Sequence, residues 1–226
     1  MINKELQNMI LEGKHQTQDF EYAISDSIKI AQTFSAFANT DGGRILLGVM
    51  KDGTIAGIQS EEEIKLAETA AKIHCNPKLP FKTRQLESEE KTVVEITIPK
   101  STRKPHSAPD SDGDQRFYIR EKHQNLLANH ILIEVWKKER QGGSGLLKIR
   151  YNENKLLNYL NLHHQITFSK FCGMANISPR KAEKILINLV YMKVIKMVFT
   201  ESQVFYIMNP VPDRPTPNDP DQTFDF

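Results

Sequence analysis

A helix that gives way to a strand through two adjacent glycines is the feature that most constrains this sequence. Residues 34–49 read FSAFANTDGGRILLGV. Asn39, Gly42 and Gly43 tolerate positive φ, so the chain can leave a helix there and reverse sharply. The apolar run that follows has the length of a buried strand. Asp52-Gly53 is a hairpin signal, and it predicts a returning strand over residues 55–58.

The sequence around this segment predicts alternating helices and strands. Apolar residues recur at helical spacing before and after it, and Ser25 or Asp26 can cap the helix that leads into it. β-forming residues fill three further short runs, and a loop rich in Pro and Asp covers residues 99–114. The pattern is that of an α+β domain of mixed helix and sheet layers, over residues 1–140. Helices are expected at 5–11, 25–38, 61–73 and 125–136, and strands at 81–86, 92–98 and 116–120.

A second, smaller domain is expected over residues 146–209. The glycine-rich stretch 141–145 reads as a flexible linker, although a loop within one domain would have the same composition. Helices are predicted at 153–163, at 167–175 and from Ser178 onward, and a hairpin from strands 194–199 and 204–208. This order resembles a winged helix-turn-helix domain. The remaining residues, 210–226, hold five prolines and no long apolar run, and are expected to be a disordered acidic tail.

Charge is unevenly distributed along the chain. The formal charge is −1 over residues 1–140, +6 over 146–209 and −3 over 210–226. A basic domain before an acidic tail indicates a polyanionic partner, with an ordinary solvated basic surface as the alternative.

The composition sets further bounds. No apolar run reaches the roughly 20 residues that span a bilayer, and the N-terminus lacks the apolar core of a signal peptide. Cys75 and Cys172 have no Cys or His at metal-binding spacing, which predicts reduced, buried thiols in a cytoplasmic protein without a metal or other cofactor.

The helix that begins at Ser178 offers the sharpest candidate site. Its apolar positions repeat at i, i+3, i+4 and i+7, so the intervening polar residues face outward. In a helix-turn-helix the second helix enters the major groove, where Arg can bind guanine, Asn can bind adenine and Lys meets phosphate. A free helix start can also hold a phosphate. The expected nucleic-acid contacts here are Ser178, Arg180, Lys181, Lys184 and Asn188, with Lys193 and Lys196 reaching the flanking backbone.

The first domain resembles the Schlafen AlbA-like family, also labelled divergent AAA. The resemblance covers about residues 10–130. It is carried by AFANTDGG at 36–43, IPKS at 98–101 with Pro105, and FYIR at 117–120. It implies an α/β domain that binds nucleic acid. The basic residues that can contact the backbone are Arg44, Arg103, Lys104 and Arg120, together with His106 and Arg116.

Some eukaryotic members of that family are RNA endonucleases that use three acidic residues. Here the first acidic position falls on Lys14, the second on Asp19, and Asp52 stands for the third, although its hairpin position also suits a turn former. A lysine in place of a carboxylate removes a metal ligand and adds a repelling charge. The chain also lacks the Gly-x-x-x-x-Gly-Lys-Ser/Thr loop of an ATPase.

The sequence thus favours a DNA-binding transcriptional regulator that forms a homodimer. Double-stranded DNA is the expected partner, and RNA remains open. Two alternatives stay: a degenerate metal-dependent RNA endonuclease of the Schlafen type, and a protein-interaction adaptor that uses the acidic, Phe-containing end at residues 219–226.

Overall fold

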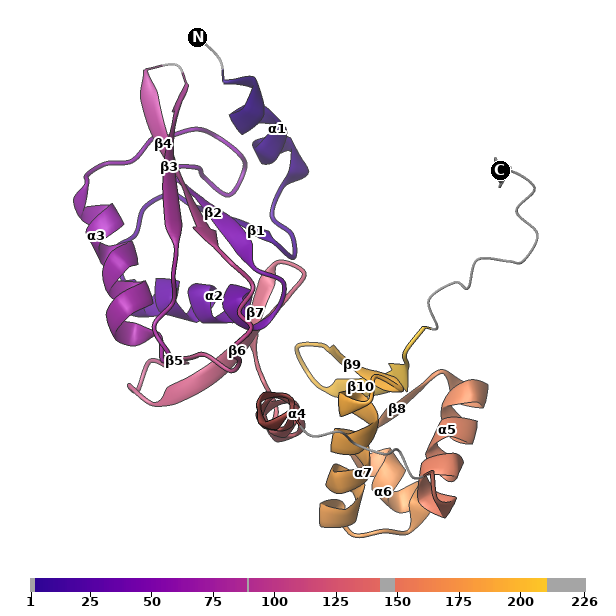
Figure 1. The fold of residues 1–226 in the computed structure, drawn as a ribbon. Helices are drawn as coiled ribbons and strands as arrows, with labels where there is room; N and C mark the ends of the chain where they lie inside the picture. The colour runs from indigo at the N-terminus through magenta and orange to yellow at the C-terminus, as the bar shows by residue number, and fades with distance from the viewer. Residues whose placement is uncertain (1–2, 89, 143–148, 211–226) are drawn as a thin grey trace, which may run out of the picture. The chain divides into compact units, whose positions relative to one another are not determined.

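The computed structural model describes residues 3–88, 90–142 and 149–210. The chain divides into two compact units, the first covering residues 1–143 and the second most of the remaining chain (Figure 1). In the predicted linker, Gln141 ends a helix and Gly142 caps it, while residues 143–145 lie outside the described part. The predicted acidic tail also lies outside it, apart from Pro210.

A four-stranded sheet in the order β1-β2-β4-β3 organises the first unit. Strand β2 (Gly43–Leu47) pairs parallel with β1 (Gln18–Glu21) and antiparallel with β4 (Lys91–Ile98), which pairs in turn with β3 (Lys82–Ser88). The sheet is therefore of mixed direction, which agrees with the α+β class expected from the sequence.

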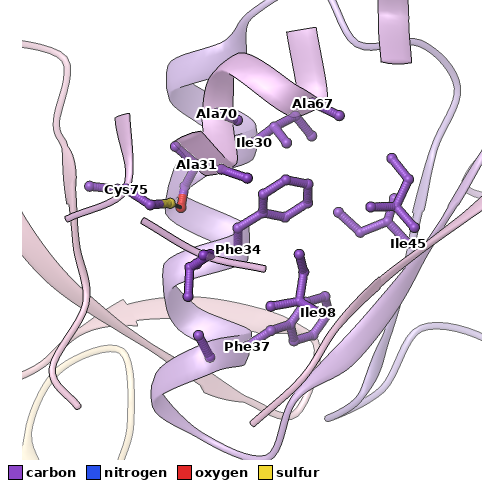
Figure 2. Packing of buried hydrophobic residues seen from close by; sticks show 14 of the residues in the cluster. Ile30, Ala31, Phe34, Phe37, Ile45, Ala67, Ala70, Cys75 and Ile98 are labelled. Carbon is purple, nitrogen blue, oxygen red and sulfur yellow. Dashed lines mark hydrogen bonds between the residues drawn. The ribbon is translucent and has the colours of Figure 1, made fainter. Parts of the chain in front are cut away.

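One face of this sheet packs on the helix that precedes the two glycines. Helix α2 (Ser27–Asn39) is capped by Asp26, whose carboxylate accepts from the backbone N–H of Ile28 at 2.8 Å. Phe34 and Phe37 are fully buried against alternate residues of the sheet (Figure 2). Among these residues, Ile45 belongs to β2 and Ile98 belongs to β4. Helix α3 (Glu62–Thr69) and the π-helical turn η1 (Ala70–His74) complete this core with small alanines.

The opposite face of the sheet is covered by helix α1 (Lys4–Glu12). Leu6 and Met9 are buried there against Phe20, Leu46 and other residues of the sheet. Leu46 lies between two residues that face α2, as the two-residue period of a strand requires.

A second sheet, β5-β6-β7, joins α2 through a buried asparagine. Its strands are β5 (Ser107–Pro109), β6 (Gln115–Glu121) and β7 (Gln124–Leu127). The Asn39 side chain donates to the carbonyl oxygens of His106 at 2.8 Å and Tyr118 at 2.9 Å, and accepts from the His106 backbone N–H at 2.7 Å. The last turn of α2 is thereby fixed to β6 and to the residue that precedes β5.

The predicted hairpin after the two glycines is wrong in part. The turn forms, since Asp52 accepts from the backbone N–H of Thr54 at 2.9 Å and Gly53 has φ of 89°. No strand covers residues 55–58, where a single bridge joins Val49 to Ile55. The partners of β2 are β1 and β4, which come from other parts of the chain.

The helix predicted over residues 125–136 is displaced. Strand β7 takes its first residues, and helix α4 begins at His130 and runs to Gln141. Asn129 sets this start, because its side chain accepts from the backbone N–H of Leu132 at 2.9 Å. The loop predicted over residues 99–114 likewise contains the short strand β5.

The second unit combines helices with a small sheet. Its elements in chain order are α5 (Tyr151–His163), β8 (Gln165–Thr167), α6 (Phe168–Ala175), α7 (Pro179–Tyr191), β9 (Ile195–Phe199) and β10 (Val204–Met208). The sheet order is β8-β10-β9, with β8 antiparallel to β10. Leu156, Phe171 and Leu186 are fully buried in this unit. Among the described residues of both units, no helix has the length and apolar character needed to cross a membrane.

Candidate nucleic-acid interface

Helix α7 begins where Ser178 caps it. The Ser178 hydroxyl oxygen accepts from the backbone N–H of Lys181 at 3.4 Å, and Pro179 occupies the first helical position. Asn176 ends α6 in the left-handed region with φ of 50°, which turns the chain between the two helices.

The two faces of α7 have opposite character. Ala182, Ile185, Leu186 and Leu189 are buried in the second unit, as their spacing predicts. The residues expected to contact nucleic acid are all exposed: Ser178, Arg180, Lys181, Lys184 and Asn188. Arg180, Lys181 and Lys184 form no ion pair with any residue that the structure describes. This face therefore presents three positive charges to solvent.

Two further predicted contacts follow the helix. Lys193 lies in the turn before β9 with φ of 56°, and the Asn209 side chain donates to its carbonyl oxygen at 2.9 Å. Lys196 is an exposed residue of β9. Both side chains are exposed. The hydrogen bond from Asn209 holds the backbone of Lys193 in place.

In the first unit, Arg44 is already engaged. Its Nη2 donates to Glu12 Oε2 at 2.6 Å and its Nε donates to Gln18 Oε1 at 2.6 Å. The side chain keeps 26% of its surface exposed. A phosphate would thus have to compete with the carboxylate of Glu12.

The prediction that Arg120 contacts nucleic acid is wrong. The residue is 1% exposed, its Nη1 lies 2.9 Å from Asp19 Oδ2, and its guanidinium stacks 5.0 Å from the centre of the Phe37 ring. It also donates to Asn125 Oδ1 at 3.0 Å. Arg120 is a buried residue that joins β6 to β1, so no phosphate reaches its side chain.

His106 and Arg116 are also occupied. The Arg116 guanidinium contacts Asp110 and Asp114, each at 3.0 Å. The His106 ring is buried, with Nδ1 2.8 Å from the carbonyl oxygen of Pro77 and Nε2 2.7 Å from Ser101 Oγ. Burial lowers the pKa of His106 and favours the neutral ring. Because a carbonyl only accepts, Nδ1 carries the proton, and Nε2 accepts from the Ser101 hydroxyl.

Two predicted residues on the loop before β5 are differently placed. Arg103 is exposed, and its backbone N–H donates to Ser101 Oγ at 3.0 Å. Lys104 is half-buried, and its Nζ reaches the carbonyl oxygen of Thr40 at 3.5 Å. Burial and the nearby ammonium of Lys100 lower the pKa of Lys104. In the described residues neither Arg103 nor Lys104 forms an ion pair.

The acidic positions considered for a nuclease do not gather. Asp19 is 6% exposed, and its Oδ1 lies 2.6 Å from the Lys14 Nζ while Oδ2 binds Arg120. Asp52 is an exposed turn former whose pKa is lowered by the hydrogen bond from Thr54. Within the described ranges, no group of three or more His, Cys, Asp or Glu side chains is placed to hold a metal ion.

Sequence reasoning missed two residues that shape this region. The sequence predicts Asn39 as a residue of the turn, but it is the last residue of α2 and its side chain connects this helix to the second sheet. Ser101 anchors the loop before β5 through His106. The signal in the sequence is the residue type of Asn39. A polar side chain at the apolar end of a helix has to form several hydrogen bonds when it is buried.

Comparison with known proteins gives the context of this geometry. No curated protein matches the chain. A protein of Corynebacterium diphtheriae, DIP2311, is 16% identical with a TM-score of 0.44, over 63% of this chain and 32% of its own, so the likeness spans about a third of that protein. The N-terminal domain of a putative ATP-dependent DNA helicase RecG-related protein from Nitrosomonas europaea is 19% identical with a TM-score of 0.37, over 57% of this chain and 96% of that domain.

The model of the family described as Schlafen, AlbA_2 matches residues 9–129, which is more than half of the chain and most of the first unit. This match agrees with the resemblance carried by the segment around the two glycines, and it favours a nucleic-acid-related function. The chain therefore belongs to the Schlafen AlbA_2 family.

Proposed function

We propose that this protein is a DNA-binding transcriptional regulator whose second unit is a winged helix that reads duplex DNA with α7. The observation that carries the proposal is the face of α7 formed by Arg180, Lys181 and Lys184. It is exposed and cationic, and it lies opposite a fully buried apolar face.

The order of elements supports this reading. A helix, a short strand, two helices joined by a tight turn and a two-stranded hairpin follow one another, and all three strands share one sheet. In a helix-turn-helix the second helix of the motif enters the major groove, and here that helix is α7. The strands β9 and β10 would form the wing.

The residue types on α7 match the chemistry of a DNA groove. Arg180 can bind guanine through two hydrogen bonds, while Lys181 and Lys184 are suited to phosphate. The exposed start of the helix adds backbone N–H groups and a positive dipole end near Ser178. Asn188 lies one turn beyond Lys184 on the same face.

In this proposal the first unit contacts the DNA backbone through Arg103 and Lys104. Arg44 makes a weaker contact of the same kind. Pairing of two chains would present two copies of α7 to a symmetric site. We therefore propose a homodimer, which a mass measurement in solution at micromolar concentration tests directly.

An RNA endonuclease is less well supported. Metal-assisted cleavage needs carboxylates that are available to a cation. Both oxygens of Asp19 are bound to the cationic groups of Lys14 and Arg120, with which a metal ion would have to compete.

The test is a fluorescence-anisotropy titration of the full chain against random duplex DNA across a salt series. Binding should weaken steeply with salt, because phosphate contacts release counterions. Replacing Arg180, Lys181 and Lys184 with Ala should lower the slope of log affinity against log salt by about three. A matched control replaces Lys65, Lys72 and Lys78, three exposed lysines of the first unit, with Ala.

The control distinguishes the contribution of the α7 face from the effect of total charge, because both triple variants lose three positive charges. An equal loss in the two variants, or an unchanged affinity and slope in the α7 variant, would remove the basis of the proposal.

A further inference from the structure

We propose that the first unit has a phosphate-binding site of its own, in a hollow between the loop before β5 and the end of α4. The hollow has a volume of about 300 Å³, which is at the lower end of the range for small-ligand pockets. It is lined by Ser101, Thr102 and Lys104 of the loop and by Trp136, Glu139 and Arg140 of α4. The site does not depend on α7.

Two cations of this hollow form no ion pair in the described residues, although the carboxylates of Glu139 and Asp41 lie near enough to act on the charge of Lys104. Lys104 reaches only the Thr40 carbonyl oxygen, at the long distance of 3.5 Å, and Arg140 forms no ion pair. Lys100, in the same loop, is different, because its Nζ lies 3.0 Å from Asp41 Oδ1. Burial lowers the pKa of Lys104 despite these two carboxylates, so an anion in the hollow would stabilise its charged form.

The loop that carries these groups is held in place before any ligand arrives. The Ser101 backbone N–H donates to the Ala38 carbonyl oxygen at 2.9 Å, and the Ser101 hydroxyl is bound to the His106 ring at 2.7 Å. The His106 ring is fixed in turn by Pro77. Since the Ser101 hydroxyl is committed to His106, the hydroxyl available to an anion is that of Thr102.

The donor set fits a phosphate group. Arg140 offers a planar fork that matches two oxygens of a phosphate, Lys104 offers a point charge, and Thr102 offers a neutral donor. The three come from two different elements, so they approach a tetrahedral anion from more than one side.

Glu139 opposes the anion, since it lines the same hollow and its negative charge acts on Lys104. It gives the proposal a test in the opposite direction, because removing its charge should strengthen binding. The phosphate can belong to a nucleic-acid backbone, which rests on the proposed function, or to a free phosphorylated molecule, which does not.

The first experiment is calorimetric titration of the full chain with inorganic phosphate at low ionic strength in a buffer without phosphate. Lys104→Gln and Arg140→Gln should each weaken binding about tenfold or more, as loss of a charge-assisted hydrogen bond does. Glu139→Gln should strengthen it several-fold. Lys72→Gln is the matched control, because it removes the same charge from an exposed residue of the same unit.

A second arm identifies the source of the phosphate. Duplex DNA is titrated into the wild type and Lys104→Gln, and inorganic phosphate into the variant that lacks the three cations of α7. Weaker DNA binding by Lys104→Gln assigns the site to the nucleic-acid backbone. Unchanged DNA binding, with loss of phosphate binding, assigns it to a free phosphorylated molecule. Phosphate binding by the α7 variant keeps this site separate from the proposed function.

The site is overturned if the folded wild type binds no phosphate at low salt. It is also overturned if Lys104→Gln binds phosphate as Lys72→Gln does. Circular dichroism of each variant confirms that loss of binding is not loss of folding.

Discussion

Arg120 Nη1 lies 2.9 Å from Asp19 Oδ2 in the interior of the first unit, and both residues are nearly inaccessible to water. Asp19 also binds Lys14 at 2.6 Å, so one carboxylate is shared by two cations from different parts of the chain. The pair connects β1, at the edge of the first sheet, to β6 of the second sheet.

Removing one partner of this pair should be strongly destabilising. Asp19→Ala leaves the Arg120 charge buried and is expected to lower the free energy of unfolding by about 3–5 kcal/mol. Urea denaturation followed by circular dichroism measures the change. The control is Glu68→Ala, which breaks the exposed pair with Lys72 and should have a much smaller effect. Equal losses of stability in the two variants would mean that the buried pair contributes no more than the exposed pair.

Gly42 should not accept a side chain. It has φ of 77°, and a Cβ atom there would lie 2.7 Å from the backbone nitrogen of Lys100. Gly113 has a similar φ of 86° with open space around it. Gly113→Ala should thus cost about 1–2 kcal/mol from backbone strain alone, and Gly42→Ala clearly more. Thermal unfolding of the two variants compares them, and equal melting temperatures would refute the steric argument.

The buried ring of His106 predicts a pH dependence of stability. Burial lowers its pKa in the folded protein below the usual value of 6.5, so the unfolded chain binds the proton more readily. Stability therefore rises with pH in this window: it is complete above about pH 6.5 and is lost as the pH falls toward the lower pKa of the folded state.

The titration of this one group changes the free energy of unfolding by at most about 1.4 kcal/mol per pH unit. Urea denaturation of the wild type and His106→Asn between pH 5 and pH 7.5 isolates it. The variant should be less stable at pH 7.5 and should show a shallower dependence. Parallel curves would show that another group is responsible.

The two thiols should differ in reactivity. Burial raises the pKa of Cys75 to about 12, and its Sγ lies 3.5 Å from the Ala31 carbonyl oxygen in the core (Figure 2). Cys172 is only partly buried. A thiol reagent at pH 8 should modify Cys172 in the native protein and both thiols in denaturant, since the thiolate is the reactive form. Cys172→Ser should abolish the native reaction, and rapid labelling of that variant would contradict the prediction.

The segment around the two glycines could be predicted because its signals are local. Asp26, Gly42 and Gly43 set the ends of α2 and β2 through hydrogen bonds and steric limits that involve few neighbours. Ser178 and Pro179 did the same for α7, and the exposed face of that helix follows from its apolar spacing. In such places the sequence pattern and the structure agree.

Prediction from the sequence fails where contacts between residues far apart in the chain determine the structure. Strand β1 is a short, mostly polar segment, and it becomes a strand because Gln18 and Phe20 are buried against α1 and β2. The sequence predicts a surface cation at Arg120, because the partner that buries it is about a hundred residues away in the chain. The same limit applies to the hollow near Lys104, whose walls come from a loop and a helix that local patterns do not bring together.

The side chain of Asn39 has a consequence for the motion of the neighbouring loop. The loop from Ser101 to His106 is attached at both ends to the last turn of α2, by the Ala38 carbonyl oxygen and by the Asn39 amide. Its conformational entropy is thus removed when the first unit folds, and not when a ligand binds. Amide hydrogen exchange in this loop should follow the opening of the core itself, so the loop belongs to the same cooperative unit as the sheet.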